Sequence, residues 1–255
     1  SAERALQSSL DPSSNLYIGT DLDTMWTRIF YHVWWPGQGN DPMYLANISM
    51  NRDRNNYYGN NYTPHMYTNG KDSGSNTNNW KNDPRTYLNE VGLYEILIDG
   101  NQSGNSIDFN VTSSSISNSS SDIRLYVATV MGHVKYSKSP NGLTDHHDAV
   151  IEILTGNSGK KMNYIAADKQ VDSFSWSMPK NWIDHPSINW NSNDIKVVAW
   201  IQNYNSKEIH FICVDKRVQE QEGTYLLLEK GEKVILPPNV TNVPALLLLN
   251  HGHRV

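Results

Sequence analysis

The densest group of potential metal ligands in the chain is the Asp-His-His-Asp motif at residues 145–148. Apolar spacing after it predicts a short amphipathic helix over 145–154, and adjacent histidines on a helix point about 100° apart. Such a pair chelates one ion less readily than histidines four residues apart. Capping of the helix start by Thr144 or Asp145 is the simpler role, because acidic groups suit the positive end of a helix dipole. We therefore expect no metal and no other cofactor.

Thiol chemistry is limited by a single cysteine, Cys213, which lies in a predicted buried strand. One thiol excludes an intrachain disulfide, a CxxC redox pair and a Cys-rich zinc site. His133 falls in a predicted strand, where a packed or hydrogen-bonded role is expected, and His251 and His253 are expected in a turn. No nucleophile-elbow motif and no phosphate-binding Gly-rich loop is present. These residues therefore predict no catalytic group.

The composition narrows the class of partner. The 255 residues carry a formal net charge of −5, and without Lys/Arg clusters such a chain offers no surface for nucleic acid. The mean hydropathy is −0.59, and no apolar run approaches the roughly 18 residues that span a bilayer. Asparagine is abundant, and six sequons raise the alternative of glycosylation in a secretory setting. They begin at Asn47, Asn61, Asn101, Asn110, Asn118 and Asn239.

The elements of the first segment alternate between strand and helix. Residues 26–35 are aromatic and β-branched and end at a Pro-Gly pair, which predicts a buried strand. Residues 41–58 read as a helix that stops at Gly59. A short strand over 62–67, interrupted by Pro64, leads into an Asn-Gly hairpin turn at 69–70. Helical spacing is also present at 2–10, and the polar stretch 71–84 reads as a long loop or linker.

The second segment is dominated by alternating apolar and polar residues, the pattern of antiparallel strands with one buried face. The predicted strands cover 88–98, 106–116, 122–136, 170–178 and 195–204. With the helix at 145–154 they predict a β-sandwich that carries one helix.

Strongly apolar strands follow in the tail, and they cover 209–214, 224–228, 233–236 and 245–249. The leucine run 246–249 reads as a central strand buried on both faces. A half-domain of about 45 residues does not readily bury such leucines alone, so we expect it to pack on the rest of the chain or on another subunit.

Two parts of the chain resemble a known family. The first is YHVWWPGQGNDPMY (31–44) with NRDRNNYYGNNYTPHMYTNG (51–70), which resembles the middle of a thioredoxin fold. The second is LYVATVMGHVKY (125–136), residues 139–160 and DIKVVAWIQNYNSKEIH (194–210), which are similar to the β-rich part of Omp28-related proteins. In those extracytoplasmic bacterial proteins a thioredoxin-like domain precedes a β-sandwich. The resemblance covers about 200 residues.

The resemblance implies a site at the edge of the thioredoxin-like sheet. The proline that matches Pro64 is cis in that family and faces the redox cysteines. Backbone beside such a proline can pair with an extended substrate, which implies a peptide-binding groove close to His32. The implied groove residues are Trp34, Trp35, Tyr62, Pro64 and His65.

One feature of the family pattern is missing. The helix that follows the CxxC strand in redox-active members resembles SAERALQSSL at residues 1–10, so the strand and both cysteines are absent from this sequence. Two explanations remain open: truncation of a redox-active parent, or a member that kept the fold without the catalysis. A sheet without that strand would expose an unpaired edge, which favours truncation or a partner that fills the gap.

The tail raises a second resemblance. Residues 211–218, 224–240 and 243–255 are similar to core strands of a thioredoxin-like protein of large DNA viruses, in which Pro244 would be the cis proline. A virion would then be the alternative location.

Together these observations predict an α+β, mostly β chain. Residues 1–84 would form an incomplete thioredoxin-like domain, 85–207 a β-sandwich with one helix, and 208–255 a β-rich half-domain. The leading functional hypothesis is a non-catalytic extracytoplasmic protein that associates with a protein partner or with other subunits of an assembly. A thiol–disulfide oxidoreductase whose CxxC is missing from this sequence, and a structural component of a large virus particle, are the alternatives.

Overall fold

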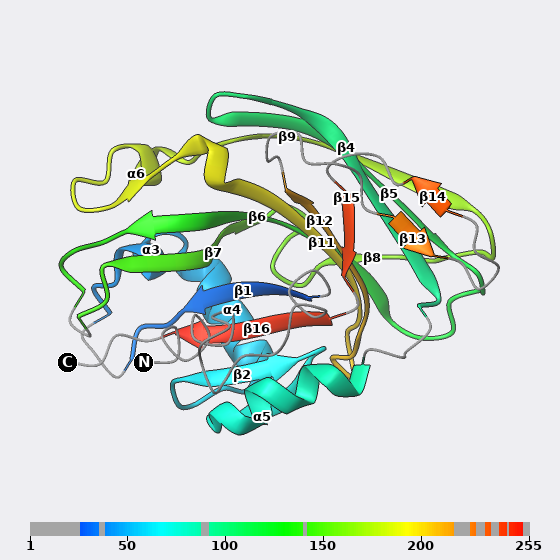
Figure 1. Cartoon of the computed structure of the whole chain (residues 1–255), viewed down its shortest axis with the longest axis horizontal. Coiled ribbons are helices and arrows are strands. Elements are labelled where there is room, and N and C mark those ends of the chain that lie inside the picture. Colours follow the sequence, from blue (N-terminus) through cyan, green and yellow to red (C-terminus); the bar gives the residue numbers. More distant parts are fainter. Residues whose placement is uncertain are drawn as a thin grey trace.

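Strands dominate the architecture of the chain (Figure 1). The computed structural model describes residues 26–35, 39–87, 92–139, 142–216, 225–227, 233–235, 240–243 and 245–251. Within them lie an 11-stranded mixed sheet, a three-stranded antiparallel sheet and a two-stranded hairpin. A few short helices accompany these sheets. The predicted class, α+β and mostly β with packed sheets, is confirmed.

The large sheet joins strands from all three predicted segments. Its path runs through β15 (Val240–Val243), β12 (Ile209–Lys216), β11 (Ile195–Asn203), β6 (Ile123–Lys135), β7 (Asp145–Ile153), β1 (Trp26–His32), β16 (Ala245–His251), β2 (His65–Thr68) and β3 (Lys71–Gly74). The short strands β8 (Lys160–Lys161) and β10 (Asn189–Trp190) pair with β6 off this path. The β11–β12 hairpin crosses the predicted boundary at 207/208. The division into three domains stays a prediction.

Strand β16 of the tail occupies the interior of this sheet. It pairs in parallel with β1, from Trp26 opposite Ala245 to His32 opposite His251, and antiparallel with β2. The tail therefore packs on the rest of the chain, as expected, and the strand predicted at 246–249 is central. His251 ends a strand, so the predicted turn is wrong there, because the ladder with β1 extends to this residue. His253, Pro244, Asn239 and residues 2–10 lie outside the described residues.

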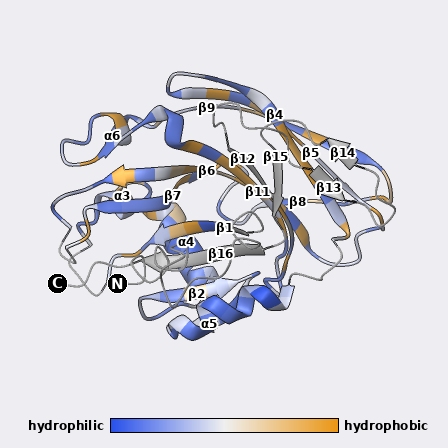
Figure 2. Ribbon diagram, viewed as in Figure 1, coloured by the Kyte–Doolittle hydropathy of each residue, from blue (hydrophilic) through white to orange (hydrophobic). Residues whose placement is uncertain are grey.

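Two hydrophobic cores lie on opposite faces of the large sheet. On one face, β6 residues such as Leu125 and Val127 pack against Ile98 and Phe109 of the three-stranded sheet. That sheet consists of β4 (Tyr94–Ser103), β5 (Ser106–Ser115) and β9 (Lys169–Ser177). The other core gathers Tyr126 and Trp200 with residues of helix α4 (Ile48–Tyr58). Figure 2 shows hydrophobic residues concentrated in the strands, whereas helix α5 (Thr77–Asn82) is mainly hydrophilic. Strands β6 and β11 are thus buried on both faces.

The predicted helix at 41–58 is two helices, α3 (Pro42–Ala46) and α4 (Ile48–Tyr58). Asn47 interrupts it because its side chain accepts the Met50 N–H at 3.2 Å and so caps α4. Gly59 ends α4 in the left-handed conformation, which confirms the predicted stop.

The stretch 71–84 is not a loop. It holds β3, helix α5 (Thr77–Asn82) and the start of a 3₁₀-helix (Asp83–Tyr87). Asn76 caps α5, and Trp80 anchors it because its ring is buried and its Nε1–H donates to the Gly74 carbonyl at 2.9 Å. One buried tryptophan therefore orders a polar segment.

The predicted helix at 145–154 is also wrong, because this segment forms strand β7. Asp148 has a positive φ of 55°, and the register with β6 shifts between Thr129 and Val130. The irregularity buries consecutive apolar residues, which imitates the spacing of a helix. With no helix to cap, the Thr144 hydroxyl donates to Asp145 at 2.6 Å.

The α-helix that the structure does describe between residues 85 and 207 is the single turn α6 (Lys180–Ile183). The remaining hairpin is β13 (Tyr225–Leu227) with β14 (Lys233–Ile235).

Candidate functional site

The turn that precedes β2 places the predicted site at one end of the large sheet. The Thr63–Pro64 peptide bond is cis, as the resemblance implied. His65 lies opposite Asn250 of β16, and His251 lies opposite His32 of β1. The carboxyl end of β1 and the start of β2 therefore share an end of the sheet, with β16 between them.

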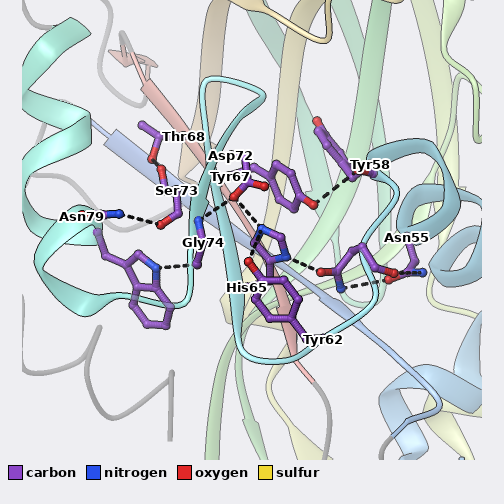
Figure 3. A network of polar contacts seen from close by, with 12 residues as sticks. Asn55, Tyr58, Tyr62, His65, Tyr67, Thr68, Asp72, Ser73, Gly74 and Asn79 are labelled. Carbon is purple, nitrogen blue, oxygen red and sulfur yellow. Dashed lines mark hydrogen bonds and ion pairs between the residues drawn. The ribbon is translucent and has the colours of Figure 1, made fainter.

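His65 is the centre of a polar network at this turn (Figure 3). Its side chain is 4% exposed, and its Nε2 lies 2.7 Å from Oδ1 of Asp72 on β3. The same carboxylate oxygen accepts the Gly74 N–H at 2.7 Å. On the other side of the ring, Nδ1 contacts Oδ1 of Asn60. The network thus fastens the turn before β2 to the β2–β3 hairpin.

The orientation of Asn60 decides what His65 can do. The Asn60 amide nitrogen donates to Asn55 Oδ1 at 3.1 Å, so Asn60 turns its carbonyl oxygen toward Nδ1 of His65. A carboxylate accepts at Nε2. Both ring nitrogens of His65 therefore face oxygen atoms that can accept hydrogen bonds, one from Asn60 and one from Asp72. Because neighbouring side chains contact both nitrogens, these contacts give His65 a structural role in holding the turn before β2.

Tyr62 forms the exposed part of the site. Its ring stacks on His65 with centroids 4.2 Å apart, and His65 stacks on Tyr67 at 4.4 Å. Tyr62 is 41% exposed. Desolvation and the charge of Asp72 raise the pKa of its phenol, so Tyr62 is neutral at physiological pH. The result is a fixed aromatic surface with a hydroxyl at its rim.

Trp34 and Trp35 belong to a second group at the same end of the sheet. Trp34 lies against Trp35, with centroids 4.5 Å apart, and against Tyr44 at 5.8 Å. The Arg52 guanidinium lies 5.2 Å from the Trp34 ring, and its Nε–H donates to the Tyr44 hydroxyl at 2.7 Å. The five predicted groove residues therefore form two groups with β16 between them, and a joint groove stays a prediction.

His32 has a structural environment. Its side chain is 3% exposed, and Nδ1 lies 2.7 Å from Oδ2 of Asp41. The other Asp41 oxygen accepts the Met43 N–H at 2.9 Å and so caps α3. His32 therefore links β1 to the start of α3 beneath the surface. His133 is hydrogen-bonded as predicted, with Nε2 2.8 Å from Asp145 Oδ1.

Neither a metal cluster nor a thiol lies at this end in the described part of the chain. No group of three or more His, Cys, Asp or Glu side chains there is arranged to hold a metal ion. Cys213 lies on β12 and pairs with Asn242 of β15. Asn242 precedes β16 by only a few residues, because β16 begins at Ala245. The strand from Ala245 to Asn250 covers roughly 17 Å at about 3.3 Å per residue. Cys213 is thus near the opposite end of β16 from Pro64.

The sequons occupy unequal positions. Asn47 is committed to the fold, because it caps α4 and its amide donates to the Ile151 carbonyl at 3.2 Å. Asn61 and Asn118 are exposed outside the helices and strands, and Asn101 and Asn110 are exposed on β4 and β5. Their glycosylation stays a prediction.

The sequence reasoning missed Asn60 and Asp72. A signal for Asp72 was present, because the turn at 69–70 sets Tyr67 opposite Asp72 and puts it on the face of His65. Asn60 depends on the left-handed Gly59 turn and had no comparable signal. Arg54 was also missed. It is 0% exposed and lies 4.7 Å from the rings of both Tyr57 and Tyr126.

Comparison with known proteins yields only distant similarity. No protein-family model and no curated protein matches the chain. A domain of the outer membrane lipoprotein Omp28 from Porphyromonas gingivalis aligns over 49% of this chain and 88% of that domain, with 8% identity and a TM-score of 0.32. The E. coli curli protein CsgC aligns over 44% and 90%, with 11% identity and a TM-score of 0.23.

A β-glucosidase from Listeria innocua, solved with isofagomine, aligns over 46% of this chain and 15% of its own, with 8% identity and a TM-score of 0.22. At these TM-scores the alignments establish no function, which is therefore inferred from the site itself. Among the described helices, none combines the length and apolar character needed to cross a membrane.

Proposed function

We propose that the chain is a non-catalytic extracytoplasmic protein that binds a protein partner at the end of the large sheet formed by Tyr62, Pro64 and His65. The single observation that carries the proposal is the exposed Tyr62 ring stacked on a buried His65 whose two nitrogens both face acceptors. Such a surface is rigid and has an apolar face with a polar rim, which suits a protein contact. The extracytoplasmic location is taken from the sequence resemblance alone.

The contacts of His65 and the position of Cys213 favour a binding site over a catalytic site. Asn60 and Asp72 contact both ring nitrogens of His65, and the chain's one cysteine lies near the far end of β16. Tyr62 needs no rearrangement to meet a partner, because His65 and Asp72 already hold its surroundings in place. Pre-organisation of this kind lowers the entropy cost of association.

Selection from a displayed peptide library tests the proposal. Peptides selected on the wild-type chain should perturb backbone NMR signals of residues 60–68 and 72–74 first. The replacement Tyr62→Ala should weaken their binding by about tenfold or more, the scale of an aromatic contact at a binding surface. Tyr164→Phe is the control, because Tyr164 is buried in the core between β6 and the three-stranded sheet, away from the site. Selected peptides that bind equally well to Tyr62→Ala would refute the assignment.

An insulin-reduction assay tests the non-catalytic part separately. In the presence of dithiothreitol, the wild-type chain and Cys213→Ser should precipitate insulin no faster than the reductant alone. The physical reason is that thiol–disulfide exchange by a dithiol needs a second, resolving thiol. Acceleration by the wild-type chain that Cys213→Ser abolishes would support the oxidoreductase alternative instead.

A further inference from the structure

A second surface lies on the three-stranded sheet, away from the Tyr62 end. Its outward face carries rows of polar side chains in register across β4, β5 and β9. Asp99, Asn110 and Ser173 form one row, and Asn101, Asp108 and Ser175 form the next. These residues surround a hollow of about 480 Å³. We call this surface the acidic hollow.

Among the described residues, the two carboxylates of the acidic hollow have no cationic partner. Within the described residues, neither Asp99 nor Asp108 forms an ion pair, although Asp108 accepts a hydrogen bond from the Ser175 hydroxyl at 2.6 Å. Asn110 likewise accepts from Ser173 at 2.7 Å. Both carboxylates lie on exposed strand positions. The hollow therefore presents two negative charges and an array of oxygen acceptors, which is complementary to a cationic group.

Strand β9 borders the acidic hollow and is an edge strand. Among the described strands it pairs with β5 alone. Its nine residues run in unbroken register, without a proline or a bulge, and its only lysine is the first residue, Lys169. Natural sheets usually protect such edges with prolines, bulges or inward charges; of these β9 has only one inward charge, Asp172, which is already paired with Lys160. An edge this long and regular offers its backbone groups to another strand.

We propose that β9 accepts an extended, basic peptide segment of a partner protein as an additional strand, with its cationic side chains over the acidic hollow. A strand added to β9 would lie one interstrand distance from β9 and two from β5, which carries Asp108. The added strand would therefore be about 10 Å from β5. An arginine or lysine side chain placed opposite Ser175 can extend across β9 and reach the carboxylate of Asp108, which pairs with Ser175. Val171, which is 61% exposed two rows away, offers an apolar contact on the same face.

Charge argues for a basic partner over a second copy of this chain. An antiparallel pair of β9 strands would bring two acidic hollows toward each other, and each copy carries a net charge of −5. Like charges across an interface oppose association. The surface is also independent of the Tyr62 end, so the two proposals stand or fall separately.

The test uses a fluorescein-labelled heptapeptide of alternating threonine and arginine, with arginine at three positions, and the full chain. Fluorescence polarisation at low salt should show saturable binding that weakens as salt rises. The double variant Asp99→Asn with Asp108→Asn should weaken binding by roughly tenfold or more. Its control, Asp53→Asn with Asp184→Asn, removes the same charge from exposed positions in α4 and directly after α6, and should leave binding unchanged. Thermal unfolding should show that all variants fold.

A second peptide separates strand addition from simple charge attraction. An N-methylated version of the heptapeptide keeps every charge but loses the backbone donors on one edge, so it should bind much more weakly than the parent. Tyr62→Ala should bind the parent peptide as the wild type does. Equal binding of the N-methylated peptide, or undiminished binding by the Asp99/Asp108 variant, would overturn the proposal. A dimer in sedimentation that the Asp99/Asp108 change strengthens would also overturn it, in favour of a second copy.

Discussion

At the scale of single residues, the buried charge of Asp148 controls how three strands meet. Its carboxylate lies 2.7 Å from Lys196 Nζ on β11 and 3.2 Å from Arg28 on β1. Burial opposes ionisation, but the charges of Lys196 and Arg28 hold the pKa of Asp148 below its usual value. Its contribution to stability is therefore present above pH about 4, where an unfolded aspartate ionises, and is lost as pH falls through the lower native pKa.

Replacing Asp148 by asparagine should expose this contribution. Asn keeps the shape and tolerates the positive φ of 55°, but it leaves two cations without their carboxylate. Urea unfolding at pH 7 should show a loss of about 3 to 5 kcal/mol, the range for breaking a buried ion pair. The difference from wild type should shrink as pH falls below about 4. A difference that is constant from pH 7 to pH 3 would contradict the ionised pair.

A second residue, Tyr31, should govern the alkaline limit. Burial raises its pKa to about 12 although the charge of Arg54 opposes this. The unfolded phenol ionises near pH 10, so stability is full below that pH and falls as pH rises toward about 12. Tyr31→Phe should unfold within about 1 kcal/mol of wild type at pH 7. At pH 11 it should be the more stable of the two in chemical denaturation. Identical alkaline losses in both proteins would contradict this account.

Single residues were also where the sequence was most informative. Pro64 and His65 were assigned to the site from the family pattern, and the cis bond is as implied. The sequence could not place Asp41 against His32 or Asn60 against His65, because those contacts depend on turns between elements. The Asp-His-His-Asp motif was read with the wrong period, since a strand with a bulge gives the apolar spacing of a helix.

At the scale of elements, the β2–β3 hairpin is held against the turn between β11 and β12. Gly70 has φ of 81°, and a Cβ there would lie 1.7 Å from the Lys207 carbonyl oxygen. Next to it, the Asn69 carbonyl accepts the Ile209 N–H at 3.0 Å. Only glycine allows this close approach, which ties the site's hairpin to the sandwich strands.

The matched pair Gly70→Ala and Gly104→Ala tests this contact. Gly104 also has a positive φ, of 56°, but nothing lies within 4 Å of the position that a Cβ would take there. Gly104→Ala should therefore cost only about 1 kcal/mol of unfolding free energy. Gly70→Ala should cost about 3 kcal/mol or more, because backbone must move. Equal costs in thermal or urea unfolding would show that the hairpin is not held there.

Helices and strands were predicted well where apolar residues recur at regular positions. They were predicted poorly where a single buried residue stabilises the element. The strands predicted at 106–116, 122–136 and 195–204 are all present within one or two residues, whereas the strand predicted from residue 88 begins at Tyr94. Helix α5 was missed because Trp80 is its one buried residue among polar neighbours. Hydrophobic periodicity cannot predict a helix that is stabilised by one buried aromatic ring.

At the scale of the whole molecule, the large sheet is continuous because β16 lies between β1 and β2. The sequence indicated that the thioredoxin-like part lacks a strand and that the tail needs a packing surface. It could not join the two statements, because strand order between distant segments leaves no local pattern. In the structure, strand β16 of the tail joins β1 to β2 within the large sheet.

The position of β16 predicts unequal effects of proline. Leu248→Pro should remove backbone pairing inside the large sheet and cost about 3 kcal/mol or more. Val234→Pro, in the two-stranded hairpin, should cost less because it pairs with one strand only. Urea unfolding followed by tryptophan fluorescence gives both values. Equal costs would contradict an interior position for β16.

The central claim is that the Tyr62 end of the sheet binds a protein partner without thiol chemistry. Isothermal titration of one library-selected peptide against the wild type, Tyr62→Ala and Cys213→Ser tests it most directly. The account predicts that Cys213→Ser binds as the wild type does and that Tyr62→Ala binds about tenfold more weakly or worse. Loss of binding in Cys213→Ser with full binding in Tyr62→Ala would contradict it.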